Sequence, residues 1–268
     1  MVFSLPMGAS AQVQLLPAKE ALAIFAGDGR RITVAFHNPG NEMARVELRI
    51  RLYQTSTATA VLLSETSWKP LQILPGQTVT ETATLAFPAV RAETRCLVQW
   101  LDGTNTVLGN TQVRVFPTNQ LVHLRTLAGE TPVGLFDPND QLKPLLRALE
   151  VPFQDLVEDG TDKFMGKLAL FGPFPEKSQM RASLADDIRA LAKRGVAVVW
   201  LQPPPSQRTP LKPSFYLVRQ AGAAIVVAQA SLVEGLAGNP EAQLNLLRLA
   251  ELALKPIAFD LPETETSN

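Results

Sequence analysis

Apolar and polar residues alternate along short runs in the first part of the chain, between residues 12 and 117. In the segment MARVELRIRLYQ every second residue is apolar, namely Val46, Leu48, Ile50 and Leu52. The residues between them are charged, and in the segment RRITVAFH large apolar residues recur at the same spacing of two. This period of two predicts antiparallel strands that bury one face in a core and turn the other towards water.

Turn residues separate these runs at similar intervals. Asn38-Pro39-Gly40 ends one run, and the tetrapeptide DGTN, residues 102–105, lies between two others as a hairpin turn does. Further apolar runs of this kind are TAVLLSETSW, QTVTETATLAF and TQVRVFP. Seven or so short strands within about 100 residues predict an all-β sandwich of the immunoglobulin-like kind over residues 12–117.

The pattern changes in the second part of the chain, residues 130–258. Continuous apolar runs such as KLALF, VAVVWLQ and AAIVVAQ alternate with segments of helical spacing. The segments that predict helices are DQLKPLLRALEV, SLADDIRALAKRG and NPEAQLNLLRLAELAL. This alternation predicts an α/β domain with a mainly parallel sheet covered on both faces. FYLVRQ and AAIVVAQ predict an antiparallel hairpin at the sheet edge, with Ala221-Gly222 in its turn.

Two of the helices have recognisable start signals. Ser183 and Asp186 have the spacing of a capping box, with Asp in place of Glu. Asn239 is a favourable N-cap residue, Pro240 suits the first helical position, and Glu241 favours the positive end of the helix dipole. We therefore expect helices that begin after Ser183 and after Asn239.

Three segments are predicted to lie outside the two domains. Residues 118–129 are interpreted as a linker, and the polar residues 259–268 as a disordered tail. Residues 1–11 are apolar and end in Ala9-Ser10-Ala11, the small-x-small pattern of a signal-peptidase site. With Gln12 as the mature start, the protein is expected outside the cytoplasm, periplasmic or secreted, and Met1 is then a late start or an internal residue of a longer signal. The alternative is an ordinary apolar terminus.

Composition argues against several functions. The chain has 25 basic and 25 acidic residues without a Lys/Arg block, which gives no support to nucleic-acid binding. Its apolar runs are too short or too charged for a membrane-spanning helix. With Cys96 as its single cysteine, an intramolecular disulfide is impossible. His37 and His123 lack nearby companions, so neither predicts a metal site, and no cofactor motif is present.

The order of segments in the second half resembles the class I glutamine amidotransferase-like domain, in the form appended to bacterial glycoside hydrolases of the β-galactosidase type. The matching positions are Val226, Val227, Gln229, Pro240, Ala242, Leu246, Leu247 and Leu249. The preceding sandwich resembles the immunoglobulin-like domains of the same enzymes, and together the resemblance covers about residues 20–255. It implies a flavodoxin-like three-layer fold for the second domain, without the catalytic barrel of those hydrolases.

The resemblance does not extend to catalysis. An amidotransferase needs a cysteine nucleophile at a strand-to-helix elbow, where this chain has Gly172-Pro173. Cys96 lies in the sandwich half and is interpreted as a buried apolar residue. The amidotransferase reaction is therefore excluded.

A candidate ligand site remains at the carboxyl ends of the predicted parallel strands, where open α/β sheets bind ligands. The polar residues expected there are Asp137, Asn139, Glu176, Gln202 and Gln229. They suit hydrogen bonding to a polyol or sugar. The alternative is that Asp137-Pro138 starts a turn and that Asn139 or Asp140 caps the next helix.

Three functions follow as hypotheses. The first is a non-enzymatic, exported accessory or scaffolding protein that interacts with a carbohydrate or protein partner in a bacterial envelope or polysaccharide system. The second is a hydrolase acting on a glycoside or ester with carboxylates at the strand ends. The third is a subunit of an envelope transport assembly, which predicts an exposed apolar patch.

Overall fold

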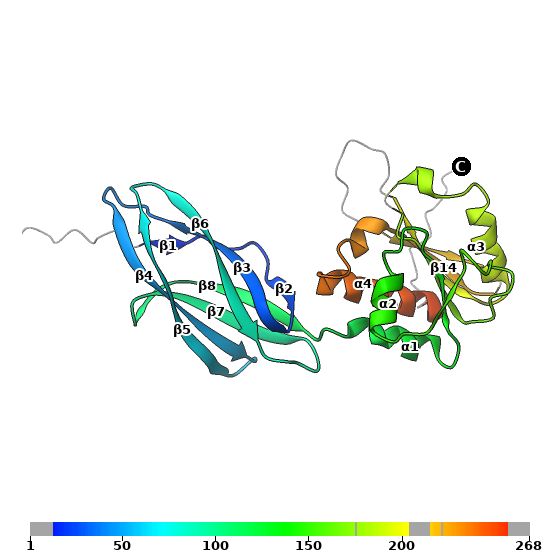
Figure 1. The fold of residues 1–268 in the computed structure, drawn as a ribbon, viewed down its shortest axis with the longest axis horizontal. Coiled ribbons are helices and arrows are strands. Elements are labelled where there is room, and N and C mark those ends of the chain that lie inside the picture. Colours follow the sequence, from blue (N-terminus) through cyan, green and yellow to red (C-terminus); the bar gives the residue numbers. More distant parts are fainter. Residues whose placement is uncertain (1–12, 175, 204–214, 221, 257–268) are drawn as a thin grey trace, which may run out of the picture. The chain divides into compact units, whose positions relative to one another are not determined.

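The structure is a computed structural model that describes residues 13–174, 176–203, 215–220 and 222–256. The chain divides into two compact units, Met1–Thr118 and Asn119–Asn268. The first contains antiparallel sheets, and the second contains helices and a mostly parallel sheet (Figure 1). The predicted two-domain fold, a β-sandwich followed by an α/β domain, is confirmed.

The first unit is built from strands β1 (Gln14–Leu15), β2 (Leu22–Phe25), β3 (Gly27–His37), β4 (Ala44–Thr55), β5 (Ala60–Ile73), β6 (Thr78–Phe87), β7 (Thr94–Asp102) and β8 (Thr106–Phe116). Within the described residues they form one sheet in the order β1-β3-β6 and another in the order β2-β8-β7-β4-β5. Neighbouring strands are antiparallel except β2 and β8, which are parallel. The predicted turn at residues 102–105 connects β7 to β8.

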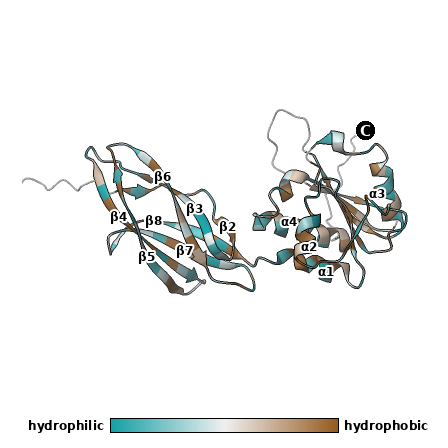
Figure 2. Cartoon of the chain, in the orientation of Figure 1, coloured by the Kyte–Doolittle hydropathy of each residue, from teal (hydrophilic) through white to brown (hydrophobic). Residues whose placement is uncertain are grey.

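Strand β4 shows why these residues form a sandwich. Its four alternating apolar side chains are at most 5% exposed, while the charged residues between them lie on the other face. On that outer face, the carboxylate of Glu65 on β5 forms ion pairs with the guanidinium groups of Arg49 and Arg51, each with an N–O distance of 2.9 Å. Figure 2 shows apolar and hydrophilic residues alternating along strands of this unit. In the core, the Trp100 indole Nε1 donates a hydrogen bond of 2.9 Å to Oγ1 of Thr111.

The second unit contains strands and helices in alternation. Its strands are β9 (Val133–Phe136), β10 (Phe153–Asp155), β11 (Leu168–Phe171), β12 (Ala197–Gln202), β13 (Phe215–Arg219) and β14 (Ala224–Gln229). Its helices are α1 (His123–Ala128), α2 (Lys143–Ala148), α3 (Leu184–Lys193) and α4 (Pro240–Leu254), with short 3-10 turns η1 (Gln120–Val122), η2 (Lys177–Gln179) and η3 (Ala230–Val233). The short strand β10 was not predicted.

The sheet of this unit has the strand order β10-β9-β11-β12-β14-β13. All neighbours are parallel except β13, which pairs antiparallel with β14 at the edge as predicted. Ala221 of the predicted turn lies outside the described residues. Numbering the parallel strands alone gives the order 2-1-3-4-5, which is the flavodoxin-like order.

Helices cover both faces of this sheet, which makes three layers. One apolar cluster joins α1, α2 and α4 to the sheet, and a second joins α3 to the opposite face. Side chains of strand β12 divide between the two clusters, with Val199 and Leu201 on the α4 side and Val198 and Trp200 on the α3 side. The strands are therefore buried on both faces, which explains their continuous apolar sequences.

Of the segment predicted as a linker, residues 118–129, all but Thr118 are instead folded into the second unit. It contains η1 and α1, and its Leu121, Leu124 and Ala128 belong to the core beneath α4. The side chain of Gln120 also donates a hydrogen bond of 3.3 Å to the carbonyl of Pro240. The apolar spacing over these few residues is too short to reveal a helix, and the segment packs against α4, which lies far along the chain. The predicted signal remnant, residues 1–11, and the predicted tail, residues 259–268, lie outside the described residues.

The two predicted helix caps have different outcomes. Asn239 caps α4, since its side-chain oxygen accepts hydrogen bonds from the backbone N–H groups of Glu241 and Ala242. Ser183 precedes α3 but its side chain makes no capping hydrogen bond, so the capping-box prediction is wrong. The backbone of Ser183 is already helical, with φ −77° and ψ −6°. A capping side chain needs an extended backbone to reach the first N–H groups.

Candidate functional site

The point where the strand order reverses lies between β9 and β11, and doubly wound sheets bind ligands in the crevice beside such a point. Here three phenylalanines fill that position. The rings of Phe136 and Phe171 stack with centroids 5.4 Å apart, and Phe174 lies 6.2 Å from Phe136. All three are at most 6% exposed, and the guanidinium of Arg181 lies 5.1 Å from the centre of the Phe136 ring. The reversal point is thus packed with side chains.

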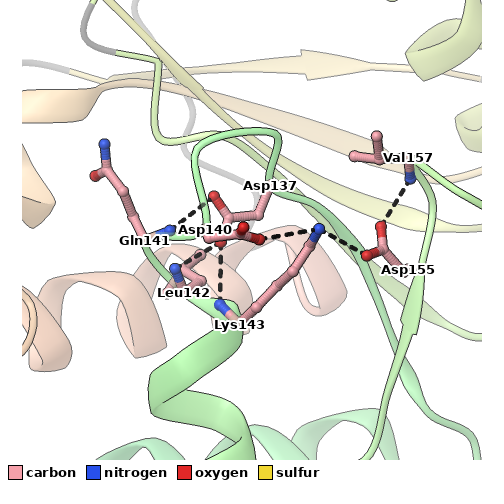
Figure 3. Close-up of polar contacts among 7 residues, drawn as sticks. All are labelled: Asp137, Asp140, Gln141, Leu142, Lys143, Asp155 and Val157. Atoms are coloured by element: carbon pink, nitrogen blue, oxygen red, sulfur yellow. Dashed lines mark hydrogen bonds and ion pairs between the residues drawn. The ribbon is translucent and has the colours of Figure 1, made fainter.

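Asp137, the first candidate site residue, follows β9 and is fully buried. Its carboxylate accepts three backbone hydrogen bonds at the start of α2, from the N–H groups of Gln141, Leu142 and Lys143 at 3.1, 2.6 and 3.0 Å (Figure 3). Those N–H groups have no partner inside a helix, so a carboxylate stabilises them and the positive end of the dipole. Asp137 therefore caps the helix, a role that the sequence suggested for Asn139 or Asp140.

A buried ion pair lies next to this cap. Lys143 Nζ lies 2.6 Å from Oδ2 of Asp155 and 3.2 Å from Oδ1 of Asp140 (Figure 3). Burial acts to lower the pKa of Lys143, but its hydrogen bonds to Asp155 and Asp140 outweigh this effect, and the pKa is raised above its ordinary value. The ammonium group thus stays charged and ties α2 to the end of β10.

Sequence reasoning missed Lys143 and Asp155. A lysine in the first turn of a helix is unfavourable for the helix dipole, and this was the one available signal. Its partner lies on β10, a strand of three residues that the sequence pattern does not reveal. Without that strand nothing indicated that the two residues meet.

The other candidates separate into two groups. Glu176 lies on the surface after β11, where its Oε2 accepts a hydrogen bond of 3.1 Å from the hydroxyl of Ser178. Asn139 is half-buried in the turn before α2. Gln202 and Gln229 are brought together, because they are register partners at the ends of the parallel strands β12 and β14. Both are half-buried.

A row of mostly aromatic residues crosses the sheet two positions before these two glutamines along their strands. Neighbouring strands place Phe136, Phe171, Trp200, Val227 and Tyr216 in register across the sheet. Register partners point to the same face, and so do residues two apart on a strand. Gln202 and Gln229 therefore lie on the same face as Trp200 and Tyr216, the face covered in part by α3. Sequence reasoning did not single out either aromatic residue.

Three cavities lined by described residues lie away from these candidates. One of about 500 Å³ is at the opposite, amino end of the strands, lined by Lys167, Ala197 and Arg219 among others. A groove of about 790 Å³ lies between α1, α4 and the start of β13. A third, of about 490 Å³, lies on the sandwich beside Arg95 and Arg114. None of these three includes a candidate residue from the sequence.

The side chains of Cys96 and His37 lie in surroundings that indicate structural roles. Cys96 is 3% exposed within β7, and burial raises the pKa of its thiol. His37 Nδ1 lies 3.1 Å from the hydroxyl of Thr78 on the neighbouring strand. Within the described ranges, no three His, Cys, Asp or Glu side chains lie together as a metal site requires. In the same part of the chain, none of the helices combines the length and apolar character needed to span a membrane.

Comparisons with known proteins give distant likenesses. No protein-family model matches the chain, and a search of curated proteins found no relative. The alkylpurine DNA glycosylase AlkC of Pseudomonas fluorescens aligns with a TM-score of 0.31 and 14% identity, over 40% of this chain and 31% of that one. A β-glucosidase from Listeria innocua aligns with a TM-score of 0.30 and 12% identity, over 39% of this chain and 16% of that one. Spo0M, a sporulation control protein from Bacillus subtilis, aligns with a TM-score of 0.29 and 14% identity, over 43% of this chain and 56% of that one.

The chain spans less than two thirds of each of these three structures. The likeness to glycoside hydrolase chains is therefore distant and partial.

Proposed function

We propose that this protein is a non-enzymatic accessory or scaffolding protein, exported from the cytoplasm, that interacts with a carbohydrate or protein partner in an envelope or polysaccharide system. The observation that carries the proposal is the filled reversal point of the sheet. Phe136, Phe171 and Phe174 pack where related architectures leave a crevice for a ligand.

The role of the Asp137 carboxylate supports the same proposal. Asp137 directly follows Phe136, and its carboxylate is committed to three backbone hydrogen bonds. A glycoside hydrolase needs two carboxyl groups that flank a substrate bond, one of which exchanges a proton with it. A buried carboxylate that caps a helix suits neither task. The export part of the proposal rests on the Ala9-Ser10-Ala11 pattern.

The test is a turnover assay on the full chain with chromogenic glycosides and esters. We expect the wild type, Asp137→Asn and Glu176→Gln to give the same background rate. A reproducible turnover that falls in either variant would overturn the proposal and favour a hydrolase. Export is tested separately, by fractionating cells that make the natural precursor; retention of the protein in the cytoplasm would contradict it.

A second candidate function is a subunit of a larger envelope assembly, and one observation favours it. The edge strand β5 exposes three consecutive apolar residues, Val61, Leu62 and Leu63, at 58%, 49% and 39%. Consecutive exposed apolar residues on an edge strand are typical of contact surfaces. Leu62→Lys should then lower the mass of the particles that analytical ultracentrifugation measures at high protein concentration. Val107→Lys, at another exposed apolar position, serves as the control and should leave that mass unchanged.

A further inference from the structure

The exposed end of the aromatic row carries an inference about the ligand. Trp200, Val227 and Tyr216 are register partners on β12, β14 and β13, so their side chains lie on one face. Trp200 is half-buried and Tyr216, at the sheet edge, is 58% exposed, whereas Val227 between them is 3% exposed. The small Val227 thus lies between two large rings.

Polar groups stand beside these rings. Gln202 and Gln229 follow Trp200 and Val227 by two residues, so their amides lie on the same face, one step nearer the strand ends. Each amide offers donors and an acceptor. The indole Nε1 of Trp200 is buried and has no hydrogen-bond partner among the residues that the structure describes. Such a donor is unusual in a native protein and calls for a partner.

The spacing of this surface fits a chain of sugar rings. Neighbouring strands lie about 4.8 Å apart, so the backbones of Trp200 and Tyr216 are separated by about 10 Å, a length that a disaccharide spans. Aromatic rings bind the apolar C–H faces of sugars, while amides bind their hydroxyl groups. The side chains of the described row, together with the two amides, carry no charge, which favours a neutral sugar over an acidic one.

We propose that Trp200, Tyr216, Gln202 and Gln229 form a binding surface for a neutral, hexose-based oligosaccharide. This inference rests on the proposed function and deepens it by naming the class of ligand and the surface that binds it. It also explains why Tyr216, a large aromatic side chain, is exposed at the edge of the sheet.

The chain offers a matched control on the same strand. Phe215 precedes Tyr216 and is exposed to nearly the same extent, 53% against 58%. Since alternate residues of a strand point to opposite faces, Phe215 lies on the α4 face, where it lines the groove beside α1 and α4. Phe215→Ala therefore removes an equally exposed ring from the same strand without touching the proposed surface.

The experiment is isothermal titration calorimetry of the full chain with cellotetraose and mannotetraose as neutral probes and tetragalacturonic acid as the acidic one. We expect a neutral probe to bind, and its Kd to rise by about tenfold in Gln202→Ala and in Tyr216→Ala, as the loss of one hydrogen bond or ring contact predicts. Phe215→Ala should bind as the wild type does. Trp200→Phe, which keeps a ring and removes the N–H, should weaken binding less than Tyr216→Ala.

Three results would overturn the inference: no neutral probe binds the folded wild type, the acidic probe alone binds, or Phe215→Ala weakens binding as much as Tyr216→Ala. Circular dichroism melting of each variant shows that it is folded before it is titrated. Any of these results leaves the proposed accessory function standing, because the turnover assay decides that function independently.

Discussion

The ammonium group of Lys143, at the start of α2, lies 2.6 Å from the carboxylate of Asp155, at the end of β10. Their side chains are 9% and 13% exposed, so the pair is largely removed from water. Asp140, which adopts a positive φ of 50°, completes the arrangement from the turn before the helix. This contact fastens the short edge strand β10 to the helix that precedes it.

Removing the cation should leave the carboxylate of Asp155, which is 13% exposed, without its partner in a poorly solvated place. Lys143→Met is therefore expected to lower the free energy of unfolding by about 3 kcal/mol, the lower end of the range for breaking a buried ion pair. Differential scanning calorimetry measures the change. Lys163→Met, at an exposed lysine of the same unit, is the control and should change stability by less than about 0.5 kcal/mol. Equal effects in the two variants would show that the ion pair adds nothing.

The same contact predicts a pH dependence. The pKa of Lys143 is raised in the folded state, so the stabilisation is fully present below the ordinary lysine pKa of about 10.4. It is lost as the pH rises through the higher, folded-state pKa. The stability difference between the wild type and Lys143→Met should thus stay constant from neutral pH to about pH 10 and shrink above it. Urea unfolding across this range checks the prediction, and a difference that already shrinks near pH 8 would contradict it.

Asp137 is expected to matter for stability through its cap. Asp137→Ala removes the acceptor of three backbone N–H groups, of which those of Leu142 and Lys143 are buried. The expected loss is about 2 kcal/mol, the upper end of the range for N-caps. Asp137→Asn keeps one side-chain oxygen and should lose less. Asn239→Ala, which removes the exposed cap of α4, provides a comparison and should lower the free energy of unfolding by about 1 kcal/mol. Should Asp137→Ala prove as stable as the wild type, the cap assignment fails.

The sandwich core has its own test in the hydrogen bond from Trp100 to Thr111. Trp100 is 0% exposed and Thr111 is 4% exposed, so Thr111→Val leaves a buried indole N–H unpaired. This should cost about 1–3 kcal/mol, whereas Thr111→Ser keeps the hydroxyl and should cost less. Equilibrium unfolding followed by tryptophan fluorescence provides the measurement. Identical stabilities of the Val and Ser variants would argue against the bond.

Cys96 should be unreactive in the folded protein. Burial raises the pKa of its thiol, and the thiolate is the reactive form. At pH 8 a chromogenic disulfide reagent should therefore label the folded chain much more slowly than the urea-unfolded chain. As the pH rises above about 8.5, the ordinary thiol pKa, ionisation favours the unfolded chain, so stability contributed by this residue declines there. Rapid labelling of the folded chain at pH 8 would contradict the buried position.

The candidate site was predictable only in part. Each of its sequence-derived residues lies near the end of a strand, because continuous apolar runs reveal where strands stop. Which of them meet depends on strand order, and that order joins Gln202 to Gln229 while leaving Glu176 on the surface. The roles also depend on the surroundings, since Asp137 is committed to a cap by the turn of the following five residues.

The sequence by itself determined the two fold classes, the antiparallel hairpin at the edge of the second sheet and the cap at Asn239. These features follow from interactions between near neighbours, namely the period of apolar residues and the hydrogen bonds at a helix start. Tertiary structure alone decided that Phe136, Phe171 and Phe174 fill the reversal point, that Lys143 meets Asp155, and that residues 119–129 fold into the second unit. Those contacts join segments far apart in the chain, so they depend on strand order and packing, which no local pattern encodes.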